Sequence, residues 1–204
     1  MRVISGSARG TKLRALDLPH LRPMLDRVKE ALFNVIHDNL EGARVLDLFS
    51  GCGALGIEAL SRGAASCLFV ENDPKLACLL SQNVAKCHLS ERSEILQADV
   101  FSLPRGRPAA ALLPAGLVFV DPPYAFVDDP NRRARLFESL EQMAAEWIRP
   151  GALVVLHHEP MPYALWPTRL MECFDRRVYG RSQITLFDMH RGSEREEEAS
   201  GGPS

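Results

Sequence analysis

Short apolar runs that alternate with helical patterns constrain the fold of this chain more than any other feature. The predicted strands are residues 45–49, 67–71, 93–97, 117–120 and 152–156. Four of these five runs are almost continuously apolar, which is typical of strands buried on both faces of a parallel sheet.

Helical spacing of apolar residues predicts the connections between these strands. The i, i+3, i+4 pattern within residues 28–36 and 136–147 indicates two amphipathic helices. Asp73 and Pro74 suit an N-cap and the first position of a third helix, expected to run through about Val84. The alternation predicts an α/β fold with a mostly parallel, doubly wound sheet and right-handed crossovers.

Composition shifts divide the chain into three expected parts. Residues 1–22 are expected to form a basic N-terminal arm or hairpin, residues 23–190 the α/β domain, and residues 191–204 a disordered acidic tail. Residues 104–116, rich in Pro, Gly and Ala, are expected to form a surface loop.

Charge and cysteine usage narrow the function classes. The net charge of −2 argues mildly against a nucleic-acid partner, but residues 1–29 carry seven basic groups against two acids. No apolar run is long enough for a membrane span or a signal core, so a cytoplasmic protein is expected. Five scattered cysteines without a C-x-x-C pair argue against a zinc knuckle and a disulfide framework.

A glycine turn follows the first predicted strand, in the segment VLDLFSGCGALGIEAL (45–60). Glycines at 51, 53 and 56 let the backbone approach a ligand closely. The same spacing fits the dinucleotide fingerprint, and Glu71 stands 20 residues after Gly51, where that fingerprint has its ribose-binding acid. An NAD-dependent oxidoreductase is therefore one alternative.

Strand-end acids favour S-adenosylmethionine as the cofactor instead. Asp47 precedes the turn, where it would repel a pyrophosphate but attract an ammonium and a sulfonium. Glu71 is expected to accept the ribose hydroxyls, and Asp99, beside the Val100 amide, the adenine amino group. These positions, with Asp121, end successive strands, and ligands of open α/β sheets bind along that edge.

The tetrad Asp121-Pro122-Pro123-Tyr124 predicts methylation of an exocyclic base amine. Such a nitrogen is a poor nucleophile, because its lone pair is delocalised into the ring. Hydrogen bonds to the Asp121 carboxylate and the Pro122 carbonyl would aim the lone pair at the methyl donor, on a loop that two prolines stiffen. Tyr124 offers a face for base stacking. Hydride transfer has no use for this tetrad.

The run His157-His158-Glu159 resembles a metal cluster but is not expected to be one. Adjacent strand residues face opposite sides of a sheet, so the two histidines are poorly placed to share an ion. No metal site is predicted.

Five blocks of sequence resemble the RsmD family, bacterial methyltransferases of guanine N2 in 16S ribosomal RNA. They are residues 3–13, 21–34, 46–64, 119–124 and 178–182. The resemblance implies the Rossmann-like fold of S-adenosylmethionine-dependent methyltransferases. It also implies a ribosomal RNA substrate in an assembling small subunit. A monomer is expected.

The resemblance assigns roles only to matching positions. It places Asp47, Gly51 and Gly53 at the cofactor and Glu71 at the ribose; Phe49, Asn72, Asp99 and Val100 complete the set of candidate cofactor residues. The candidate catalytic residues are Asp121, Pro122 and Tyr124. RNA or active-site roles are implied for Arg9, Lys12, Arg22 and Arg27. Cys52 and Met24-Leu25 depart from the family pattern. An adenine-N6 methyltransferase and a non-enzymatic RNA-binding protein are further alternatives, and the blocks within 3–34 tell against the former.

Overall fold

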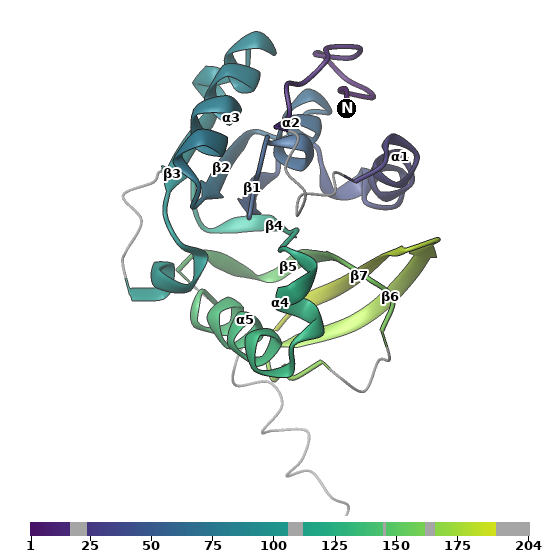
Figure 1. Ribbon diagram of the computed structural model, residues 1–204, viewed down its shortest axis with the longest axis vertical. Helices are drawn as coiled ribbons and strands as arrows, with labels where there is room; N and C mark the ends of the chain where they lie inside the picture. The colour runs from purple at the N-terminus through teal and green to yellow at the C-terminus, as the bar shows by residue number, and fades with distance from the viewer. Residues whose placement is uncertain (17–23, 106–111, 145, 162–165, 191–204) are drawn as a thin grey trace, which may run out of the picture.

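A seven-stranded sheet forms the centre of the molecule, in the order β3-β2-β1-β4-β5-β7-β6 (Figure 1). The computed structural model describes residues 1–16, 24–105, 112–144, 146–161 and 166–190. The first five strands are parallel: β1 (Arg44–Leu48), β2 (Ser66–Glu71), β3 (Ser93–Gln97), β4 (Ala115–Val120) and β5 (Ile148–His158). They confirm the predicted α/β fold and all five predicted strands.

Helices cover both faces of this sheet. Within the described residues, the α-helices are α1 (Asp26–Val35), α2 (Ala54–Ser61), α3 (Pro74–Lys86), α4 (Tyr124–Asp128) and α5 (Pro130–Gln142). Short 3-10 helices are η1 (His37–Asn39), η2 (Ser90–Arg92) and η3 (Val100–Arg105). The predicted start of α3 is confirmed, because the Asp73 side chain accepts hydrogen bonds from two backbone N–H groups of its first turn.

Two apolar clusters fill the space between helices and sheet. One lies under α1, α2 and α3, and the other lies under α5 and η3. Alternate residues of the central strands serve opposite clusters: Val45 and Phe119 belong to the first, Leu46 and Val118 to the second. All residues of β2 are buried, which explains the apolar run at positions 67–70 in this strand.

Two predicted boundaries are wrong for one shared reason. Strand β4 begins at Ala115, inside the predicted loop 104–116, and α5 ends at Gln142, before the predicted end at residue 147. The Ala115 N–H donates to the Trp147 carbonyl at 2.8 Å and Ala115 pairs with Ile148, so β4 and β5 already begin at these two residues. Residues 106–111 and 145 lie outside the described part.

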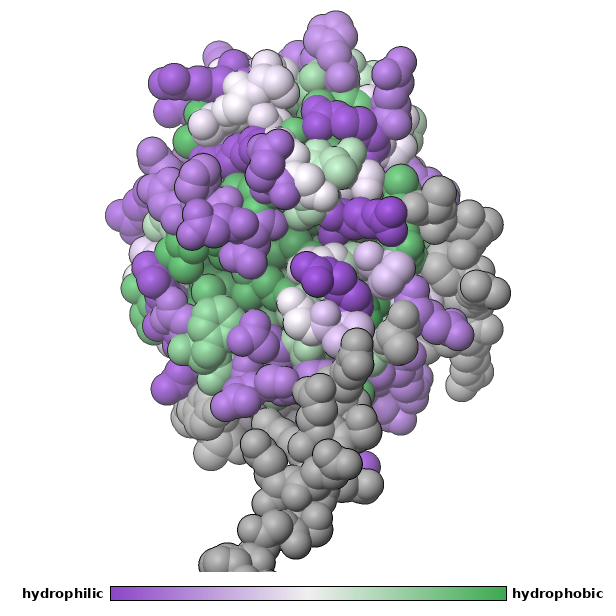
Figure 2. All heavy atoms as spheres, turned by 180° about the vertical axis from the view of Figure 1, so that it is seen from behind, coloured by the Kyte–Doolittle hydropathy of each residue, from purple (hydrophilic) through white to green (hydrophobic). Residues whose placement is uncertain are grey.

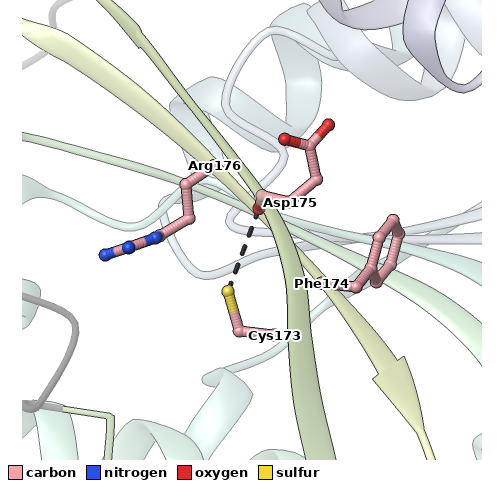
Figure 3. Close-up of a pocket in the computed structure, with 4 residues that line it drawn as sticks. All are labelled: Cys173, Phe174, Asp175 and Arg176. Atoms are coloured by element: carbon pink, nitrogen blue, oxygen red, sulfur yellow. Dashed lines mark hydrogen bonds between the residues drawn. The ribbon is translucent and has the colours of Figure 1, made fainter.

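A C-terminal hairpin extends the sheet beyond the predicted strands. β6 (Met171–Tyr179) and β7 (Ser182–Met189) are antiparallel, and β7 also pairs antiparallel with β5. β6 is the edge strand and is buried only at intervals. A shallow pocket of about 400 Å³ lies on it, lined by Cys173, Phe174, Asp175 and Arg176 (Figure 3). None of the predicted site residues lines this pocket.

Residues 1–16 pack against α2 through a buried ionic cluster. The Glu58 carboxylate accepts from the backbone N–H groups of Ile4 (2.8 Å) and Ser5 (3.0 Å). It also pairs with Lys29 of α1 at 3.0 Å and with Arg62 at 2.8 Å. The side chains of Lys29 and Glu58 are only 1% and 0% exposed. We call this group the Glu58 clamp, because it joins the N-terminal segment to α1 and α2.

The surface seen from behind is mostly hydrophilic, with apolar areas between the polar side chains (Figure 2). Among the described residues, the exposed large apolar side chains are Leu25, Phe174 and Val178. No helix in the described ranges has both the length and the apolar character needed to cross a membrane.

Candidate active site

The predicted acids meet at one edge of the sheet. Asp47 lies in β1, Glu71 ends β2 and Asp121 directly follows β4. Asp99 follows β3 after one intervening residue. Because these strands are parallel, their carboxyl ends lie along the same edge, which is where ligands of such sheets bind.

The glycine turn between β1 and α2 is built around Asp47. The Asp47 side chain is buried, and its Oδ2 accepts from the Gly56 N–H at 2.9 Å. A Cβ on Gly56 would lie 2.9 Å from that oxygen and 2.3 Å from the Phe69 ring, so only glycine fits here. Phe49 has a φ of 60°, a sparsely populated conformation typical of functional turns.

The protonation of Asp47 is set by its burial. Burial raises the pKa of Asp47 to about 8; the Gly56 hydrogen bond opposes the shift, and the charges of Asp121 and Glu71 add to it. The buried Asp47 side chain thus stabilises the glycine turn through its hydrogen bond from the Gly56 N–H. Its expected attraction for a cationic ligand stays a prediction.

Glu71 connects the turn to the next strand. Its Oε2 accepts from the Gly51 N–H and its Oε1 from the Asp73 N–H, both at 2.8 Å. A Cβ on Gly51 would point into open space, so this side of the turn has room for a ligand. The role of Glu71 toward a ribose stays a prediction.

An aromatic cluster borders the Asp99 end of the edge. Asp99 is exposed and accepts from the Phe101 N–H at 3.0 Å, at the start of η3, where Val100 is buried. The rings of Phe101 and Phe126 stack with centroids 5.5 Å apart, and Phe49 contacts both. Asn72 is exposed at the end of β2. Of this cluster, the sequence analysis found only Phe49.

The D-P-P-Y tetrad projects from the end of β4. The Asp121 side chain is 32% exposed, Pro122 is buried, and Tyr124 begins α4. The Asp121 backbone N–H donates to the Leu48 carbonyl of β1 at 3.4 Å, which ties the tetrad to the strand before the glycine turn. A partly exposed carboxylate on a proline-stiffened loop is suited to accept a hydrogen bond from a ligand.

His157 is a site residue that the sequence analysis missed. Its Nδ1 lies 2.8 Å from Asp121 Oδ1, and its ring meets the Tyr124 ring edge-on at 6.2 Å between centroids. Burial alone would lower the pKa of His157, but the charge and hydrogen bond of Asp121 outweigh burial and raise it. The missed signal was its position, since His157, like the acids, lies near the carboxyl end of a parallel strand.

The two adjacent histidines face opposite sides of the sheet, as predicted. His158 Nε2 lies 2.8 Å from Thr185 Oγ1 on β7, and burial lowers the pKa of His158 to about 4. In the part of the chain that the structure describes, no three His, Cys, Asp or Glu side chains are grouped as metal ligands.

The predicted RNA contacts are distributed along the N-terminal segment. Arg9, Lys12 and Arg27 are exposed, and Arg22 lies outside the described residues. Arg9 follows Gly6 and Ser7, which sit at the far end of α2, where the Ser7 N–H donates to the Ser61 carbonyl at 2.8 Å. Arg9 is therefore near the end of α2 that is remote from the glycine turn.

Asn83 links the N-terminal segment back to the glycine turn. This fully buried side chain accepts from the Arg14 N–H and donates to the carbonyls of Arg14 and Cys52, each at 2.9 Å. It was not found from the sequence, because a single Asn within an amphipathic helix carries no local signal of such a role.

Comparisons with known proteins agree with this geometry. A family model described as "Conserved hypothetical protein 95" matches residues 1–188. The "Putative rRNA methyltransferase YlbH" of Bacillus subtilis is 43% identical over 126 residues, covering 61% of this chain and 67% of that protein. "Ribosomal RNA small subunit methyltransferase D" of Escherichia coli K12 is 36% identical over 160 residues, covering 78% and 75%.

A solved structure extends the similarity to three dimensions. The "Putative methyltransferase yhhF from Escherichia coli" superposes with a TM-score of 0.75 at 31% identity, covering 93% of this chain and 98% of that one. The fold is therefore that of a methyltransferase architecture.

Proposed function

Because this chain belongs to the family of conserved hypothetical protein 95, the RsmD family, we propose that it methylates ribosomal RNA of the small subunit. The proposed reaction transfers a methyl group from S-adenosylmethionine to the exocyclic N2 amine of a guanine. The substrate is proposed to be RNA within an assembling particle, and the enzyme a cytoplasmic monomer.

One observation carries this proposal: Asp121 presents a partly exposed carboxylate beside the glycine turn, on a loop stiffened by two prolines. The Asp121 N–H reaches the end of β1 directly, so the amine acceptor and the turn belong to one rigid edge. That juxtaposition is what transfer between a bound donor and a base amine requires.

The residues at this edge fit S-adenosylmethionine. The open side of Gly51 leaves room for a ligand, and the Glu71 carboxylate suits a ribose-bearing molecule. A bound cation would favour the charged form of Asp47, which is otherwise protonated below about pH 8. We assign Phe49, Gly53, Asn72, Asp99 and Val100 to the same pocket. When bound, the cofactor supplies a methyl group that its positively charged sulfur makes electrophilic.

The protein positions and deprotonates the amine. As the nitrogen–carbon bond forms, the carbon–sulfur bond breaks and sulfur keeps the electron pair. The methylated nitrogen then releases one proton. We assign Asp121, which carries the carboxylate of the tetrad, as the acceptor of that proton. We assign stacking of the guanine to Tyr124 and a hydrogen bond from the amine to the Pro122 carbonyl.

The direct test is methyl transfer to defined ribosomal substrates. Small subunits, and naked 16S RNA, from cells lacking this gene would be incubated with the enzyme and methyl-labelled S-adenosylmethionine. We expect label on N2 of guanine, identified by nucleoside mass spectrometry. Label on adenine N6 would favour the alternative amine, and absence of label with tight NAD binding would overturn the proposal.

A further inference from the structure

His157 stands beside Asp121 because of the register of two parallel strands. Val120 of β4 pairs with Leu156 of β5, so Asp121, the first residue after β4, lies beside His157, the penultimate residue of β5. The bond between His157 Nδ1 and Asp121 Oδ1 measures 2.8 Å. His157 is only 1% exposed, whereas the Asp121 side chain is 32% exposed. The histidine therefore lies behind the carboxylate, on the protein side.

The second ring nitrogen of His157 argues against a role in core packing alone. Within the described part of the chain, the buried Nε2 atom has no hydrogen-bond partner. Leaving a buried polar nitrogen unpaired is destabilising, so a position selected only for packing would favour an apolar side chain. Neighbouring His158, in contrast, contacts partners through both nitrogens, Thr185 and the Glu159 carbonyl.

We propose that His157 is a positioning residue for methyl transfer, acting through Asp121. The inference rests on the function proposed above. A carboxylate oxygen can only accept, so His157 carries its hydrogen on Nδ1 and donates it to Oδ1. This bond holds the carboxylate plane and directs Oδ2 toward the target amine. The edge contact with the Tyr124 ring couples the same histidine to the stacking surface.

The arrangement also fits the proton balance of the reaction. When nitrogen gains the methyl carbon, its proton passes to Asp121 Oδ2, and the partly exposed carboxylate returns it to solvent. His157 keeps its own hydrogen on Nδ1 throughout and donates it to Oδ1. It therefore orients the acceptor without contacting substrate, and its loss should reduce turnover and leave binding unchanged.

Three variants separate positioning from structural damage. His157→Asn keeps an amide donor near the place of Nδ1, whereas His157→Leu removes the donor but fills the space. His158→Leu is the matched control, because it alters the adjacent buried histidine on the opposite face of the same strand. For each variant we would measure kcat and KM for small subunits, the Kd of S-adenosylhomocysteine, and Tm.

We expect His157→Leu to lower kcat at least tenfold, with KM and Kd within threefold of wild type. His157→Asn should recover kcat to within threefold of wild type. His158→Leu should change Tm with little change in kcat. Side-chain nitrogen NMR of the wild-type protein adds a readout independent of activity, and should show the Nδ1–H form of His157.

Two results would overturn the inference while leaving the proposed function intact: wild-type kcat in His157→Leu, or equal losses of kcat in the Leu and Asn variants. An Nε2–H tautomer in the NMR spectrum would overturn it as well. If the wild-type enzyme methylates no ribosomal RNA, the proposed function itself fails, and the assignment of His157 to that reaction fails with it.

Discussion

At the scale of single residues, carboxylates at the same sheet edge take different roles because their burial differs. Asp47 is buried under the glycine turn and bonds a backbone N–H, whereas Asp121 is partly exposed and bonds a histidine. Asp99 is exposed and caps a short helix. The same residue type at one sheet edge thus serves the glycine turn and a local cap and, in our proposal, the reaction.

Replacing Asp121 should affect turnover far more than binding. We expect Asp121→Ala to lower kcat by about 10²-fold or more, because its contacts strengthen in the transition state. The Kd of S-adenosylhomocysteine should stay within a few-fold. Kinetics on small subunits and calorimetry measure the two quantities, with the exposed Asp128→Ala in α4 as control. An unchanged kcat would remove Asp121 from the mechanism.

Asp47 should make stability depend on pH in a direction opposite to that of most acids. Its pKa is about 8 in the folded protein against an ordinary value of 3.8. As pH rises between these values, the unfolded chain loses the proton and the folded protein keeps it, so folding becomes less favourable. Asp47→Asn stays neutral and should avoid this loss.

The measurement is Tm of the cofactor-free protein between pH 4 and 9. The advantage of Asp47→Asn over wild type should grow up to about pH 8 and then level off. For Asp38→Asn, at an exposed position, the curve of Tm against pH should run parallel to that of wild type. If the Asp47→Asn curve also runs parallel, the folded protein does not hold that proton.

At the scale of elements, the Glu58 clamp explains how a basic N-terminal segment becomes part of the α/β domain. Val3, Ala8 and Leu13 of this segment are buried in the same core cluster as α1 and α2. The clamp then joins three elements through one carboxylate that two cations and two backbone N–H groups satisfy. Removing one partner leaves charge buried without compensation.

Lys29→Met should therefore destabilise the protein by about 3 kcal/mol, the typical effect of breaking a buried ion pair. The free energy of unfolding from urea denaturation is the measurement. Arg177→Gln is the matched control, since Arg177 pairs with Asp175 at 2.9 Å on an exposed surface, where ion pairs contribute little. Equal effects of both substitutions would contradict the importance of burial.

At the scale of the whole molecule, several of the basic residues that are concentrated in residues 1–29 are exposed on one side of the domain. Arg9 and Lys12 are exposed on the N-terminal segment, Arg27 is exposed on α1, and Asn83 ties the N-terminal segment to the glycine turn. A near-neutral protein can thus present positive charge on the side of the domain that carries α1, α2 and α3. We expect this surface to contact RNA phosphates.

The double substitution Arg9→Ala and Lys12→Ala should weaken RNA binding and flatten its salt dependence. Each lost phosphate contact should reduce the log–log slope by roughly 0.7 to 0.9. Cofactor affinity should not change. Binding to small subunits across a salt series is the measurement, with Arg149→Ala, which removes one exposed positive charge at the start of β5, as the control. An unchanged slope would place RNA recognition elsewhere on the chain.

The sequence by itself determined the five parallel strands, their order along the chain and the edge at which the acids meet. Strands buried on both faces are mostly apolar along their length, so β1, β2 and β4 can be predicted from the sequence without knowledge of their neighbours. A glycine turn after a strand and a D-P-P-Y tetrad are equally local, since their geometry depends on neighbours in the chain.

Only the tertiary structure decided which residues meet across the sheet. The edge strand β6 is half exposed and carries no continuous apolar run, so the C-terminal hairpin was not predicted. The burial of Asp47 depends on how closely α2 packs on β1. The pairing of His157 with Asp121 follows from the register between β4 and β5. Register and packing distance join residues 36 or more positions apart, and no local pattern encodes them.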